Sequence, residues 1–128
     1  MAGAMAKIFY VFIGGCLGTL ARYFIAQMVN DYHPGEASEL TWLYIVNLLG
    51  AFFFGVVAKH PAFATENRRN LWGVGFAGGF TTMSAITTFV DLNGLLNPWV
   101  GLMMLFGLGV YGAGYRLGRL EAKWAKNA

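Results

Sequence analysis

Few polar groups in this chain could carry chemistry, and they lie within long apolar stretches. Asn47 stands in the middle of one such stretch, and its amide offers two N–H donors without carrying a charge. It could coordinate a small anion without trapping it, or it could form a hydrogen bond that holds two membrane helices together. Polar groups at bilayer depth are costly and are therefore the first candidates for function. Both interpretations of Asn47 stay open.

A second candidate is the run GGFTTMSAITT at Gly78–Thr88, which combines two adjacent glycines with four threonines and a serine. Glycine and threonine are poor helix formers, so the run predicts a break in a helix. A break at bilayer depth frees carbonyl groups, which suit a hard cation, and N–H groups, which suit an anion. The alternative is a kinked packing helix whose hydroxyls bond back to the preceding turn.

The N-terminal apolar stretch carries Gly14, Gly18 and Arg22. The two glycines have the four-residue spacing that lets helix backbones approach closely, so they predict a packing surface. Arg22 is expected near the external headgroups, where a long basic side chain can snorkel. At the mouth of a pathway the same charge would raise the local concentration of anions.

The chemistry of most enzymes and proton-coupled transporters is missing from these stretches. No Asp, Glu, Lys or His lies at the centre of a stretch, and none contains a nucleophile–base pair. We therefore do not expect an enzyme. The single cysteine, Cys16, leaves no partner for a disulfide within the chain.

The composition requires these residues to be positioned by membrane helices. Hydrophobic residues make up 57% of the 128, and charged residues only 12%, about half the share of a soluble domain. A spanning helix needs about 20 mostly apolar residues. The sequence predicts four spans in a single all-α membrane domain over residues 1–128, with a break in the third: about 8–29, 40–58, 71–90 and 99–117.

Basic residues predict the orientation of these spans. With four spans, both termini and the second loop share one side, which holds eight of the nine basic residues: Lys7, Lys59, Arg68, Arg69, Arg116, Arg119, Lys123 and Lys126. The two opposite loops hold none. Both termini are therefore expected in the cytoplasm, with the chain in the cell inner (plasma) membrane. The net charge of +3 then reflects these loops and does not indicate binding to nucleic acid.

Three motifs together resemble the CrcB/Fluc family of fluoride channels. They are GGCLGTLARY at 14–23, VNLLGAFFFG at 46–55 and GFAGGFTTMS at 75–84. The resemblance implies passive, fluoride-selective export by an antiparallel dimer with two pores and a central sodium ion. It implies that main-chain carbonyls at the break of the third helix hold the sodium, here those of Gly78 and Thr81.

The resemblance also assigns the pore. Asn47 matches the family's pore asparagine and Arg22 its first-helix arginine, whereas Met83 and Ile86 stand where the family has two phenylalanines. Hydroxyl groups could replace the water around fluoride. The expected pore residues are Asn47, Thr82, Met83, Ser84, Ile86, Thr87 and Tyr111.

The charge bias bears on the partner subunit. A chain with one fixed orientation needs a homologous partner of opposite orientation to form an antiparallel dimer, so we favour such a partner, while self-pairing stays open. The loss of both phenylalanines keeps a second hypothesis, a non-conducting accessory subunit. A small four-helix efflux transporter is the third, although it would require a carboxylate in the first span, which is absent.

Overall fold

The computed structural model describes residues 2–35, 37–82, 86 and 98–128, and every regular element in these ranges is helical. Three of the described helices are long and apolar enough to cross a membrane: α1 (Ala2–Tyr32), α2 (Ala37–Lys59) and α6 (Pro98–Asn127). The protein is therefore an all-α membrane protein. The third expected span, 71–90, is described only to residue 82 and at residue 86, so four spans and a single domain stay predictions.

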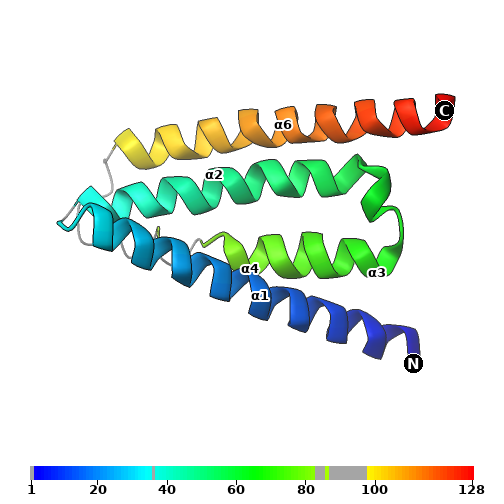
Figure 1. The fold of residues 1–128 in the computed structure, drawn as a ribbon, viewed down its shortest axis with the longest axis horizontal. Coiled ribbons are helices and arrows are strands. Elements are labelled where there is room, and N and C mark those ends of the chain that lie inside the picture. Colours follow the sequence, from blue (N-terminus) through cyan, green and yellow to red (C-terminus); the bar gives the residue numbers. More distant parts are fainter. Residues whose placement is uncertain (1, 36, 83–85, 87–97) are drawn as a thin grey trace.

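The polypeptide between α2 and residue 82 forms what we call the third helix, residues 66–80. It consists of α3 (Glu66–Arg69), a π-helical segment η2 (Asn70–Ala77) and one turn, α4 (Gly78–Phe80). In Figure 1 α2 lies between α6 and the third helix, and α1 runs along the other side of the third helix. Both termini and the connection from α2 to α3 lie at one end of the molecule.

That connection is short and is held by its own side chains. After α2 it forms a turn of 3₁₀ helix, η1 (Pro61–Phe63), which His60 caps by accepting a hydrogen bond from the N–H of Ala62 at 3.0 Å. Thr65 caps α3 by accepting from the N–H of Arg68. These caps satisfy donors at helix starts. The chain can therefore turn back within a few residues.

Lys7 and Glu66 tie α1 to the start of the third helix, with 2.7 Å between Nζ and Oε1. The hydrogen bond from Lys7 lowers the pKa of the Glu66 carboxyl, the positive charge of Lys7 lowers it further, and Arg69 contributes in the same direction. Both side chains are more than half exposed, so solvent screens the pair and its contribution to stability is small.

Glycines bring the helices together in two pairs. A Cβ on Gly18 of α1 would overlap the carbonyl oxygen of Phe76 and lie 2.8 Å from the Phe80 nitrogen. On the facing side, a Cβ on Gly75 would lie 2.7 Å from the carbonyl oxygen of Val11. Gly55 of α2 and Gly114 of α6 meet the opposing main chain in the same way. Such contact is typical of membrane helices, which associate through close packing.

The expected break in the third helix begins at Thr81. The helix ends at Phe80, and Thr81 has extended backbone angles, φ −79° and ψ 158°. The N–H of Thr81 donates to the carbonyl oxygen of Ala77 at 3.0 Å, and its hydroxyl donates to the same oxygen at 2.9 Å. The hydroxyl therefore bonds back to the preceding turn, as the packing interpretation had it, at the residue where the helix stops.

Many large apolar side chains are exposed on the long helices. Phe12 on α1 is 66% exposed and Leu108 on α6 is 73% exposed, and both helices carry further exposed Phe, Leu and Met. Exposing this apolar surface to water would be unfavourable. Lipid, or another protein chain within the membrane, would cover it at no such cost.

Candidate functional site

Asn47 holds the chain at the break. Its Oδ1 accepts a hydrogen bond from the N–H of Thr82 at 2.9 Å, while its Nδ2 donates to the carbonyl oxygen of Leu43 at 3.0 Å. Nδ2 also lies 4.0 Å from the sulfur of Met103, which is a weak acceptor. The side chain therefore links α2 to the residue that follows the helix end. This is the interhelical bond that one interpretation of Asn47 expects, made to the break itself.

Gly50 makes room for the break and was not singled out as a functional residue. It lies one turn after Asn47, on the same face of α2, because residues three apart are neighbours on a helix. A Cβ at Gly50 would overlap the Cγ2 methyl of Thr81 and lie 3.3 Å from the ring of Phe80. The spacing Asn-x-x-Gly in VNLLG places the two residues on one helix face, but no feature of the nearby sequence indicates that this face meets Thr81. Together, Asn47 and Gly50 form a socket for the break.

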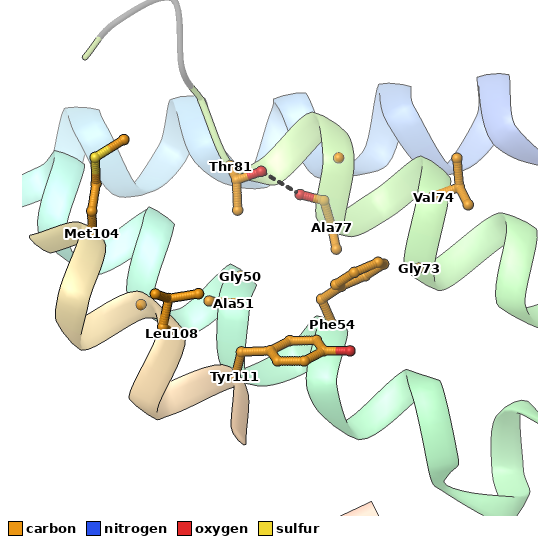
Figure 2. Close-up of a pocket in the computed structure, with 12 residues that line it drawn as sticks. Gly50, Ala51, Phe54, Gly73, Val74, Ala77, Thr81, Met104, Leu108 and Tyr111 are labelled. Atoms are coloured by element: carbon orange, nitrogen blue, oxygen red, sulfur yellow. Dashed lines mark hydrogen bonds between the residues drawn. The ribbon is translucent and has the colours of Figure 1, made fainter. Parts of the chain in front are cut away.

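A groove opens beside this socket, between the third helix and α6 and over α2. Its volume is about 760 Å³, and apolar groups form nearly all of its lining. Figure 2 shows Thr81 on one wall and Met104, Leu108 and Tyr111 on the other. The lining residues are Gly50, Ala51, Phe54, Gly73, Val74, Ala77, Gly78, Thr81, Met104, Gly107, Leu108 and Tyr111. The groove therefore brings together three residues that the sequence assigned to the site, namely Gly78, Thr81 and Tyr111.

The main chain at the break offers the oxygen atoms that a sodium site would need. The last turn of a helix leaves carbonyl groups without partners inside the helix. Hard cations prefer oxygen ligands. Gly78 is exposed, and the space where its Cβ would be is empty to 4 Å, so a ligand or a second chain can approach the backbone there. Among the described residues no cluster of His, Cys, Asp or Glu could hold a metal. The main-chain oxygens of Gly78 and Thr81 are the candidate ligands here, and the sodium site stays a prediction.

Tyr111 presents its ring and hydroxyl to the groove. The ring packs against Phe54 of α2 with 5.8 Å between centroids and an angle of 37°. Figure 2 shows the two rings beside each other, with Phe54 on α2 and Tyr111 on α6. Within the described part of the chain the Tyr111 hydroxyl has no hydrogen-bond partner, so it remains available to a ligand in the groove.

The other expected pore residues are distributed differently. Thr82 is buried, with 5% of its surface exposed, and its N–H donates the hydrogen bond to Asn47. Ile86 is also buried, at 6%, and packs in an apolar cluster with Leu43, Val100 and Met103. Met83, Ser84 and Thr87 lie outside the described residues. Their roles in the pore, and that of Ile86, stay predictions.

The α1 residues lie on the far side of the third helix from the groove. Gly14 and Gly18 meet the main chain of the third helix, at Leu71 and Phe76 respectively, which is the geometry of a packing surface. Arg22 follows on the same helix and is half-buried. In the described ranges it forms no ion pair. Its place at a vestibule therefore stays a prediction.

This geometry defines a class: a membrane protein built of close-packed helices, one of which ends within the bundle at Phe80. A family model described as CrcB-like protein, Camphor Resistance (CrcB), matches residues 9–115. The chain is 36% identical over 131 residues to the fluoride-specific ion channel FluC of Nitratidesulfovibrio vulgaris, an alignment that covers 91% of this chain and 99% of that protein. It is 33% identical over 129 residues to FluC of Solidesulfovibrio magneticus, covering 91% and 98% respectively.

The chain belongs to the CrcB family. The resemblance drawn from the three motifs is therefore confirmed. No solved structure matches the chain. The curated relatives are named ion channels, which agrees with the expectation that this protein is not an enzyme.

Proposed function

We propose that this chain is a subunit of a passive, fluoride-selective channel that exports fluoride from the cytoplasm across the plasma membrane. The observation that carries the proposal is the helix end at Phe80–Thr82, held by Asn47 at the edge of an apolar groove. Such a break is tolerated within a bilayer only where protein or a water-filled cavity covers it. The proposal that the transported ion is fluoride rests on the relatives that are named fluoride-specific ion channels.

In this proposal the chain replaces the water that surrounds fluoride with N–H and O–H donors. Among the described residues, the acceptors near Nδ2 of Asn47 are the carbonyl oxygen of Leu43 and the sulfur of Met103, and an anion is a much stronger acceptor than the sulfur. The hydroxyls of Tyr111, Thr82, Ser84 and Thr87 are the further donors. Met83 and Ile86 contribute apolar pore wall. Arg22 raises the anion concentration at a mouth of the pathway.

The cofactor of the proposed channel is a structural sodium ion at the subunit interface. The carbonyl oxygens of Gly78 and Thr81 would hold it, because they lie at the helix end where the groove opens. The ion would join main-chain oxygens of two subunits and so stabilise their contact. It would not take part in moving fluoride.

The proposed partner is a homologous chain of opposite orientation, and a second copy of this chain is the alternative. Gly78, Gly101, Gly107, Gly109 and Gly112 have open space where a Cβ would be. Small residues of this kind let another membrane helix approach closely. The end that carries both termini also carries eight basic residues, so we infer one orientation, with the termini in the cytoplasm.

A non-conducting accessory subunit is the second candidate, and the burial of Ile86 favours it. That side chain packs among Leu43, Val100 and Met103 of its own chain. A side chain that is buried in the core of its own chain does not contact an ion in a pore. In this version the partner would supply a complete pore and this chain only the matching surface. An efflux transporter finds no such support in the described residues.

Fluoride efflux from liposomes separates these candidates. The purified chain, alone or with a homologous partner, is reconstituted into vesicles loaded with potassium fluoride, and valinomycin starts the efflux. A channel releases fluoride, leaves chloride inside, and is indifferent to a proton gradient. Absence of fluoride efflux in both preparations would contradict the channel proposal. If the mixed preparation conducts only through a pore formed by the partner's residues, this chain is an accessory subunit.

Asn47→Leu tests the residue at the centre of the proposal. It removes both the donor for fluoride and the acceptor for Thr82, so we expect fluoride efflux to fall by at least about a hundredfold, from the loss of charge-assisted hydrogen bonds. Asn67→Leu is the matched control, because Asn67 is exposed in α3, outside the expected spans. Equal efflux from the two variants would show that Asn47 is not in the pathway.

A further inference from the structure

A second cavity lies at the end of the molecule that carries both termini, between the last residue of α2 and the C-terminal turns of α6. Its volume is about 470 Å³. Four of its six lining residues are cations, and none is acidic: Lys59, Tyr115, Arg119, Ala122, Lys123 and Lys126. The ion pair found among the described residues, Lys7–Glu66, involves none of these cations. Four exposed positive charges gathered around one cavity create a positive potential that attracts an anion.

The helix itself collects these charges on one face. Arg119, Lys123 and Lys126 are spaced by four and three residues, which places them one above another on α6. Glu121 is two residues from Arg119, about 200° around the helix at 3.6 residues per turn. The acidic residue of this stretch is therefore turned to the opposite side. Lys59 completes the cluster from α2, with its Nζ 5.7 Å from the ring centre of Tyr115.

The length of α6 predicts that the cavity lies at the depth of the lipid headgroups. α6 has 30 residues, or about 45 Å of helix, against about 30 Å of hydrocarbon, so its last turns extend beyond the apolar layer. Tyr115 marks the end of the apolar stretch, and tyrosine prefers the interface between membrane and water. Leu117, Leu120 and Trp124 form an exposed apolar stripe on another side of the same turns. The last turns of such a helix are expected to pass through the interface, where lipid phosphates lie.

We propose that this cavity binds the phosphate of an anionic phospholipid headgroup. Arg119 supplies a planar guanidinium that matches two phosphate oxygens, and the three lysines supply point charges around it. Basic pockets between membrane helices at the cytoplasmic side are suited to anionic headgroups. The site is separate from the groove at the helix break and does not depend on fluoride conduction.

Native mass spectrometry of the purified full-length chain tests the proposal. We expect phosphatidylglycerol to be retained on the chain and phosphatidylcholine to be lost under the same conditions. Arg119→Gln should weaken phosphatidylglycerol binding about fivefold, and Arg119→Gln with Lys123→Gln about thirtyfold, from the usual worth of one basic residue near a lipid surface. Both side chains are exposed, so melting in a zwitterionic detergent should be unchanged.

Arg116→Gln is the matched control, because Arg116 is an exposed arginine on the same helix that does not line the cavity. It should leave phosphatidylglycerol retention within about twofold of the original, because a bound headgroup in the cavity would not contact Arg116. Equal losses from Arg116→Gln and Arg119→Gln would overturn the cavity in favour of a diffuse basic surface. Equal retention of both lipids would also overturn it, as would displacement of the lipid by an equimolar amount of inorganic phosphate, which would indicate a site for the free anion.

Discussion

The two faces of the third helix differ in how they are covered. The face toward α1 is closed by main chain, because Gly75 and Gly79 lie against the backbone of α1 at Val11 and Gly15. The face toward α6 is open, because Gly78 has nothing within 4 Å of its Cβ position and lines a groove of about 760 Å³. Glycines that are adjacent in the sequence thus belong to two surfaces, one packed against α1 of the same chain and one open.

The difference shows what a glycine pattern indicates in a membrane helix. Small residues predict that another helix can come close. They do not say whether that helix belongs to the same chain. Neighbouring Gly78 and Gly79 look alike in the sequence, and only the position of α1 separates them.

The largest expected effect comes from closing the space on the α1 side. In Gly18→Ala the new methyl would overlap the carbonyl oxygen of Phe76 and crowd the Phe80 nitrogen, so the two helices must separate. Overpacking of this kind typically costs about 1–3 kcal/mol. We expect a lower melting temperature in detergent and a lower yield of folded protein.

Gly107→Ala is the matched change on the open side. Gly107 lines the groove and has no neighbour within 4 Å, so its methyl should not lower the stability of the single chain. Helix propensity should raise that stability by up to about 1 kcal/mol. Association with a partner should weaken instead, as measured by size-exclusion chromatography or cross-linking. Similar losses of stability from both variants would end the distinction between the two faces.

An intermediate effect should come from the socket that joins the two faces. Gly50→Ala places a methyl against the Cγ2 of Thr81, a side-chain atom that can shift more easily than main chain, and should destabilise the chain by about 1 kcal/mol. Thr81→Ser removes that methyl and keeps the hydroxyl that donates to Ala77. The double variant should therefore recover at least about 0.5 kcal/mol relative to the sum of the single changes, measured by chemical unfolding. Strict additivity would show that Gly50 is not there to accommodate Thr81.

The smallest effect is expected at the exposed end of the closed face. Lys7 lowers the pKa of Glu66 in the folded state, so the pair contributes stability above the ordinary pKa of the carboxyl, and this is lost as the pH falls through the lowered value. Glu66→Gln should make melting slightly less dependent on pH in that acidic range. Because both side chains are exposed, added salt should reduce the effect. A pH dependence that is unchanged in Glu66→Gln would assign it to other carboxyl groups.

Much of the fold could be predicted because it depends on local composition. Apolar length gave α1, α2 and α6, although α1 and α6 extend several residues beyond the expected spans, since helix formation continues past the hydrocarbon when the residues permit it. The poor helix propensity of Gly78–Thr82 gave the place where the third helix ends.

The parts of the site that depend on contacts between distant segments could not be predicted. Nothing in the pattern around Asn47 states that its oxygen meets the N–H of Thr82, 35 residues away. The role of Gly50 and the groove between α6 and the third helix depend on the same tertiary arrangement. The basic cavity at Lys59 and Arg119 was seen in the sequence only as a charge bias, because its two sides come from helices 60 residues apart.

The π-helical segment Asn70–Ala77 decides the direction in which the break faces. Each hydrogen bond of such a segment spans five residues, one more than in an α-helix. If the same residues formed an ordinary α-helix, the extra residue that the wider turns accommodate would rotate everything that follows by about 100° around the helix axis. Gly78 and Thr81 would then leave the wall of the groove although neither had been altered. The hydrogen-bond pattern of this segment is thus as much a part of the site as the side chains it delivers.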